Sequence, residues 1–278
     1  MTHQKSIIEI LDEHLRTGQT VLPPFSKTAS RLRQEMASGD PDFKKIERLI
    51  VCDQALTGEV LKTANSPFYK GFETIYTLRD AIVRLGSQVV ADIVLLVTQK
   101  QYYTTADPEL SPQLGKLWKH SVACAIGAQW LARRLGYGEM ADSAFTAGLL
   151  HDLGRLFLVT AMADIKKKNE AFRPSTAFMT KVIETLHPKQ GYQILKEWNL
   201  PDIFCTIARD HHKAELGTGE TLLLVVRLVD VTCNKLGFGL SGHNPIHPAE
   251  SQEASLLGVS EILFAELEIK LEDAMRKT

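Results

Sequence analysis

The sequence predicts an all-α fold in which a smaller N-terminal helical lobe precedes a larger helical bundle. Apolar residues recur three and four positions apart along almost the whole chain, which is the spacing of one face of a helix. No segment bounded by turn residues alternates apolar and polar residues as a half-buried strand does. Short groups of Gly, Pro, Asn and Ser separate the apolar segments and predict where the helices end.

The N-terminal part of the chain begins with an amphipathic helix at residues 5–16 and continues with shorter helices. An extended connector ends at Ser26, a residue type that caps helices well. Pro67 ends one helix, because proline disfavours helical backbone in the residue before it. Thr77 and Gly86 are typical of the positions that flank a helix. The remaining helices of this part are predicted near residues 29–36, 43–50, 56–64, 78–85 and 87–101.

The polar segment from Tyr102 to Pro112 contains two prolines and is the best candidate for a domain boundary. We therefore expect an N-terminal helical lobe at residues 1–105 and a second helical lobe at residues 106–278. Residues 237–248 form the one long irregular stretch of the second lobe. Its helices are predicted at residues 113–135, 139–152, 156–170, 175–187, 189–198, 202–213, 220–236 and 260–276.

The composition of the 278-residue chain argues against several classes of protein. Its 32 basic and 33 acidic residues nearly cancel, so we expect neither direct nucleic-acid binding nor attraction to a membrane surface. No apolar run reaches the length of a membrane-spanning helix, and the N-terminus lacks the apolar core of a signal peptide. Four widely separated cysteines without a Cys-x-x-Cys pair indicate reduced thiols, so we expect a cytoplasmic protein.

Histidines and aspartates of the second lobe form the pattern that carries chemistry. Five of the nine histidines fall within its predicted helices, each beside apolar residues that face inward. Asp230 ends the apolar run 222–229, and an unpaired buried carboxylate is costly unless a partner or metal compensates its charge. Imidazole and carboxylate groups both ligate metals. Their gathering on one bundle predicts a metal site at His120, His151, Asp152, His187, His211, His212 and Asp230.

The order of these residues resembles that of the HD superfamily of metal-dependent phosphohydrolases, especially its HD-GYP branch. Further motifs resemble the HDOD subfamily over roughly residues 20–215, and their combination is more specific than any one of them. They include the segments Leu22–Phe25, Ile50–Leu56, Leu61–Ser66, Ala81–Gly86, Trp118–Ser121, Gly148–Gly154 and Trp198–Pro201, together with His187 four residues before Gly191.

The resemblance implies a bundle of the HD-domain type with one or two transition-metal ions. One ion would be held by His120, His151, Asp152 and Asp230, and the second by His187, His211 and His212 with Asp152 bridging. Mixed nitrogen and oxygen ligands rich in histidine favour iron, manganese or a similar metal over magnesium or calcium. The resemblance also implies that Asp152 and Arg155 are the catalytic residues of a phosphohydrolase. Arg155 stands where relatives often carry a positively charged residue that can neutralise a phosphate.

Two departures from the enzymatic relatives shape the functional hypothesis. The Gly-Tyr-Pro signature of cyclic di-GMP hydrolases is missing after His212, and Lys116 replaces the acid that three-metal relatives place one turn before His120. We expect a bacterial signalling or regulatory protein whose N-terminal lobe contacts a protein partner or senses a small molecule. The alternative is a metal-dependent phosphohydrolase or phosphodiesterase with a nucleotide or cyclic-nucleotide substrate. The ligand set disfavours a purely structural adaptor.

Overall fold

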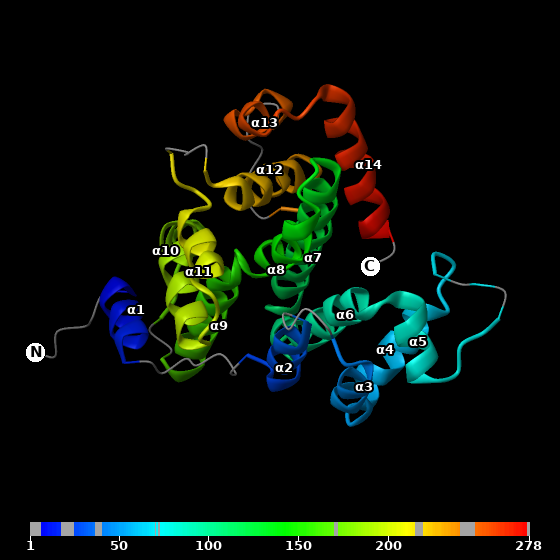
Figure 1. Cartoon of the computed structure of the whole chain (residues 1–278). Coiled ribbons are helices and arrows are strands. Elements are labelled where there is room, and N and C mark those ends of the chain that lie inside the picture. Colours follow the sequence, from blue (N-terminus) through cyan, green and yellow to red (C-terminus); the bar gives the residue numbers. More distant parts are fainter. Residues whose placement is uncertain are drawn as a thin grey trace, which may run out of the picture. The chain divides into compact units, whose positions relative to one another are not determined.

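The computed structural model describes residues 7–17, 25–36, 41–69, 71, 73–169, 172–214, 219–239 and 248–276. Every regular element among these residues is helical, which confirms the predicted all-α class (Figure 1). The chain divides into two compact units. We call Pro23–Tyr102 the small unit, and Met1–Leu22 together with Tyr103–Thr278 the large unit.

The small unit contains α2 (Lys27–Met36), α3 (Phe43–Val51), α4 (Gln54–Ala64), α5 (Leu78–Leu85) and α6 (Ser87–Lys100). Its core is built from apolar side chains that have no exposed surface, among them Ile46 and Val60. The helices begin and end at polar residues, as the sequence predicts. The side chain of Asp53 accepts two backbone N–H groups at the start of α4, and Thr77 caps α5 in the same way. The amide of Asn65 donates to the carbonyl of Leu61 in α4 at 3.0 Å and forms two hydrogen bonds of 2.8 Å with the backbone of Ile75, which tie the end of α4 to the loop that follows.

The large unit carries the candidate site, and its described helices are α1 (Ile7–Arg16), α7 (Ser111–Arg134), α8 (Ala141–Leu150), α9 (Leu153–Lys168), α10 (Thr176–Glu197), α11 (Asp202–Asp210), α12 (Thr221–Lys235), α13 (Gln252–Leu257) and α14 (Glu261–Arg276). Helix α7 contacts α8, α12 and α14 (Figure 1), and α10 contacts both α9 and α11. The centre of the large unit is apolar, and Leu131, Leu153, Leu158 and Val229 have no exposed surface.

The grouping of α1 differs from the expected N-terminal lobe, which included it. Contacts of α1 with α9 place it in the large unit. Leu11 is 4% exposed, and with Leu15 it faces Val182 and Leu186 of α10 across a cavity. An amphipathic sequence predicts that a helix has a buried face, but it does not identify the surface that covers this face.

Several predicted helix boundaries are wrong, and two of them matter for the path of the chain near the site. The helix expected at 139–152 ends at Leu150, so that His151 and Asp152 form a break of two residues before α9. The break expected at Pro188 is absent, because α10 continues through this proline. The packing of Gly191 against Gly154 of α9 and Ala208 of α11 stabilises α10 and offsets the hydrogen bond that proline cannot donate.

Among the described helices, none is by itself long and apolar enough to cross a membrane. Leu78–Leu85 and Ser87–Tyr103 meet this criterion only when they are taken together, and they are bent by 111° at Gly86.

Candidate metal centre

The structure brings all seven predicted ligands together inside the large unit. Together with Cys124 they form two groups of possible metal donors, and the donor atoms of each group lie within 4.8 Å of one another. We call His120, Cys124, His151 and Asp230 site A, and Asp152, His187, His211 and His212 site B. All members of site A are buried. In site B only His212 is exposed, and the other three residues are buried.

Two glycines permit the helices that carry these residues to approach closely. A Cβ atom at Gly148 of α8 would overlap the backbone of Cys124 in α7. A Cβ atom at Gly154 of α9 would overlap the carbonyl group of His187 in α10. The Gly148 contact shows that α7 and α8 pack closely together at Cys124. The two contacts place the His151-Asp152 break directly between His120 and His187.

The sequence predicts all five histidines within helices, and this is wrong for three of them. His120 and His187 lie within α7 and α10, but His151 and His211 are the residues that end α8 and α11, and His212 follows. The ends of α8 and α11 supply carbonyl groups with no partner inside the helix, together with the negative end of the helix dipole. Both features favour a cation at this place.

Backbone carbonyl groups orient three of the imidazole rings. The Nδ1 atom of His151 donates to the carbonyl of Gly148 at 2.8 Å, and that of His211 donates to Ala208 at 2.9 Å. The Nδ1 atom of His187 donates to Ile183 at 2.7 Å. Burial lowers the pKa of His151 to about 4 and that of His187 to about 3, so both rings are neutral at pH 7. Each neutral ring therefore presents the lone pair of its Nε2 atom to the site, as a metal ligand does.

Asp152 lies between the two groups and faces each with a different oxygen atom. Its Oδ1 is 3.4 Å from Nε2 of His187 and 3.3 Å from Nε2 of His211. Its Oδ2 is 3.5 Å from Nε2 of His120 and 3.8 Å from Nε2 of His151. The arrangement has the form of a bridging carboxylate, which is the role that the resemblance implies for this residue.

Several buried atoms of the site lack the partner that their chemistry requires. Asp152 Oδ1 and His151 Nε2 are buried and have no hydrogen-bond partner. The Nε2 atoms of His187 and His211 are only 3.2 Å apart, although Nδ1 of both rings is used by a carbonyl group. Two facing lone pairs repel each other unless a proton or a metal ion lies between them. Unsatisfied groups of this kind are costly in a protein interior, and a bound cation would satisfy all of them. The residues therefore fit a metal ion.

Site A has its own charge pair. His120 Nε2 lies 3.2 Å from Asp230 Oδ1. Burial by itself would lower the pKa of His120, but the hydrogen bond to Asp230 and the charges of both aspartates raise it to about 9. The pKa of Asp230 is correspondingly lowered, because its contact with His120 outweighs its burial. A metal ion in site A would therefore replace a proton that His120 carries at neutral pH.

Cys124 is a possible ligand that the sequence interpretation missed, since it took all four cysteines as reduced thiols with no part in the metal site. It lies four residues after His120 on the same face of α7, and its Sγ is 3.6 Å from His120 Nε2. The i, i+4 spacing is the signal that could have identified it. Cys233 is also buried but belongs to neither group of donors.

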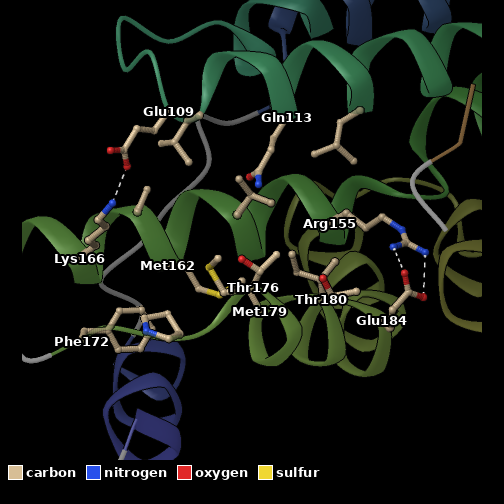
Figure 2. A pocket seen from close by; sticks show the side chains of 16 residues that line it. Glu109, Gln113, Arg155, Met162, Lys166, Phe172, Thr176, Met179, Thr180 and Glu184 are labelled. Atoms are coloured by element: carbon tan, nitrogen blue, oxygen red, sulfur yellow. Dashed lines mark hydrogen bonds and ion pairs between the residues drawn. The ribbon is translucent and has the colours of Figure 1, made fainter. Parts of the chain in front are cut away.

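Arg155 occupies a buried position between two carboxylates. Its Nε is 2.9 Å from Asp152 Oδ2. Its two terminal nitrogens lie 2.8 and 3.4 Å from the two carboxylate oxygens of Glu184, and Figure 2 shows this contact between Arg155 and Glu184. Burial would raise the pKa of Asp152, but the positive charge of Arg155 and the neighbouring histidines hold it well below its usual value. Arg155 thus neutralises the bridging carboxylate, and its suggested contact with a substrate phosphate stays a prediction.

Comparisons with known proteins agree with the architecture. The sequence model of the HDOD domain family matches residues 22–214, which is well over half of the chain. A curated relative from Treponema pallidum (strain Nichols), named only as an uncharacterized protein, is 22% identical over 196 residues. The match covers 69% of this chain and 37% of that relative, so the chain corresponds to little more than a third of the relative's length.

Solved structures share the fold at low sequence identity. An HDOD domain protein of unknown function from Geobacter sulfurreducens superposes with a TM-score of 0.76 and 22% identity, covering 96% of this chain and 95% of its own. A protein from Shewanella amazonensis SB2B, named "Putative metal-dependent phosphohydrolase", gives a TM-score of 0.72 at 17% identity, with 97% of both chains covered. By the extent of the family match, the chain belongs to the HDOD family.

Proposed function

We propose that this chain is a cytoplasmic bacterial regulatory protein whose helical core holds one or two transition-metal ions. The observation that carries the metal assignment is the pair of facing Nε2 atoms of His187 and His211, 3.2 Å apart beside the unsatisfied Oδ1 of Asp152. A second ion would be held in site A by His120, His151 and Asp230, with Cys124 as a further donor and Asp152 shared between the ions. Iron and manganese suit this mixture of ligands best.

The regulatory assignment is supported by the state of Arg155. A phosphate-binding arginine needs donors that are free to meet the substrate. Here Arg155 is 3% exposed, its Nε lies against Asp152, and its terminal nitrogens are directed at Glu184 in a cavity that no histidine of the centre lines, so they do not face a phosphate held at the metal donors. The surroundings of the site therefore favour a stable metal-containing scaffold over a centre that turns over phosphate esters.

The small unit is the part of the chain that we propose for recognition of a protein partner or small-molecule signal. Several of its large apolar side chains are exposed to solvent, and the most exposed are Phe68 at 74%, Tyr76 at 83% and Val83 at 72%. Exposed aromatic and aliphatic groups of this size are common where proteins bind partners.

A metal-dependent phosphohydrolase or phosphodiesterase with a nucleotide substrate is the second candidate. The feature in its favour is that Asp152 faces both groups of donors. A pair of ions that share a carboxylate supplies Lewis-acid stabilisation of the oxygens on a reacting phosphorus. One relative in fold is also named a phosphohydrolase, although 17% identity extends only to the fold.

One assay separates the two candidates. Wild-type protein and Asp152→Asn, each reconstituted with iron or manganese under reducing conditions, are incubated with bis(4-nitrophenyl) phosphate and with a panel of cyclic nucleotides. The regulatory proposal predicts that neither protein releases product above a metal-only blank. Turnover by the wild type that is lost in Asp152→Asn would replace the proposal with the enzymatic one.

A further inference from the structure

A cavity of about 290 Å³ in the large unit adjoins the metal centre on the side away from the metal donors. Its walls are formed by the segment that leads into α7, by α9, by α10 and by the connection before α10. Figure 2 shows Phe172 at one end of this space and the Arg155–Glu184 pair at the other. No histidine of the centre lines it, so it is a separate space rather than part of either site. We call it the Arg155 cavity.

The lining of the Arg155 cavity is mostly apolar. Leu117, Val159, Met162, Phe172, Met179 and Ile183 form its body. Pockets of about this size with such a lining and few polar groups typically hold small organic molecules. Methionine side chains adapt to ligands of different shape. The polar side chains of the lining besides Arg155 and Glu184 are those of Glu109, Gln113, Lys166, Thr176 and Thr180, and Lys166 forms an ion pair with Glu109.

The charged end of the cavity is built to receive a carboxylate. The side chain of Arg155 is 4% exposed, and its terminal nitrogens are directed at Glu184, whose side chain is 36% exposed. Glu184 holds both terminal nitrogens in the forked geometry typical of arginine and a carboxylate. Of the two partners Glu184 is the more exposed, so it is the one that a ligand carboxylate would replace. A ligand carboxylate that replaced Glu184 would leave the charge on Arg155 compensated.

We propose that the Arg155 cavity binds a small apolar carboxylic acid, with its hydrocarbon part among the methionines and its carboxylate on Arg155 in place of Glu184. Because Nε of Arg155 lies 2.9 Å from the bridging Asp152, such a ligand changes the hydrogen-bond partners of a group that touches the metal centre. The cavity is then a site where a metabolite signal reaches the centre.

Octanoate and octanamide are suitable probes, because they have the same length and differ in the charged group alone. Isothermal titration of the full-length protein should show one octanoate site per chain, with an affinity at least ten-fold higher than that for octanamide. Glu184→Gln should raise the affinity for octanoate several-fold, because the carboxylate of Glu184 no longer competes for Arg155. The ratio of the affinity for octanoate to that for octanamide should rise as well. Equal affinity for the two probes, or weaker octanoate binding by Glu184→Gln, would overturn the proposal.

A matched pair of tryptophan substitutions tests the location. Ala163 lines the cavity, whereas Ala177 of α10 is exposed and does not. Ala163→Trp should abolish binding of octanoate by filling the space, and Ala177→Trp should leave it unchanged. Equal octanoate binding by the two variants would place the ligand elsewhere and contradict the proposal. If Ala163→Trp fails to fold, the change in octanoate affinity caused by Glu184→Gln tests whether the ligand binds in the Arg155 cavity.

The readout is the heat of octanoate binding, so it is independent of the metal assignment. Metal content is measured on the same samples. A metal-containing protein that ignores octanoate contradicts this inference alone, and a metal-free protein that binds octanoate contradicts the proposed function alone.

Discussion

Asp152 joins the two groups of donors, because its two oxygens face different histidines at 3.3 to 3.8 Å. Most of this centre was predictable at the scale of single residues. Asp230 could be identified because a carboxylate at the end of a buried apolar run needs a compensating partner. Cys124 could not, because a buried cysteine in an apolar helix is usually a small core residue.

Replacement of Cys124 tests whether its sulfur is a ligand. We expect the Co²⁺-substituted protein to show a near-ultraviolet sulfur-to-metal absorption band that disappears in Cys124→Ala, because only a coordinated thiolate gives this transition. The measurement is an absorption spectrum at equal cobalt content. Cys205→Ala is the matched control, since Cys205 is also buried but its Sγ lies against the carbonyl groups of Leu200 and Pro201. A band absent from the wild type, or one lost only in Cys205→Ala, would remove Cys124 from the ligand set.

At the scale of elements, the centre depends on the close approach of α9 and α10. Gly154 meets the backbone at His187, where any side chain would overlap a carbonyl group. Its place beside the His-Asp pair is visible in the sequence, but its partner is not, because contacts between helices depend on the tertiary fold. The continuous path of α10 through Pro188 was unpredictable for the same reason. Local propensity favours a break, and packing against α9 and α11 overrides it.

We predict that Gly154→Ala destabilises the protein by about 2 kcal/mol or more, since α9 must move away from α10 or strain the backbone. The variant should also bind less metal, because Asp152 and His187 separate. Urea unfolding and elemental analysis measure the two effects. Gly58→Ala in α4 is the control, as a Cβ atom at Gly58 meets nothing within 4 Å. It should stabilise the protein by up to about 1 kcal/mol, and equal effects of the two substitutions would contradict this account.

For the whole molecule, the buried histidines predict how stability changes with pH when metal is removed. His151 and His187 have folded pKa values of about 4 and about 3, below the ordinary value of 6.5. The unfolded chain therefore binds more protons below pH 6.5, and stability is lost as the pH falls toward these values. His120, with a pKa of about 9, has the opposite effect, because its contribution is present below pH 6.5 and is lost as the pH rises through 9.

The chelated protein should accordingly be most stable near pH 6.5 to 7. Its free energy of unfolding should fall by about 1–2 kcal/mol over the first pH unit below 6.5. Urea titrations between pH 5.5 and 9 measure this dependence. His187→Gln removes one titrating ring and should make the acid side of the curve shallower. A stability that rises steadily from pH 5.5 to 9 would show that these rings do not titrate as the buried site requires.

The central claim is that the two groups of donors hold transition metal, and elemental analysis of metal bound per chain tests it most directly. Protein purified under reducing conditions and reconstituted with iron or manganese should carry one to two ions per chain after desalting. Asp152→Asn should retain less metal than His120→Ala, because Asp152 serves both groups whereas His120 belongs to site A alone. Wild-type protein that is folded yet retains less than about a tenth of an ion per chain would contradict the account.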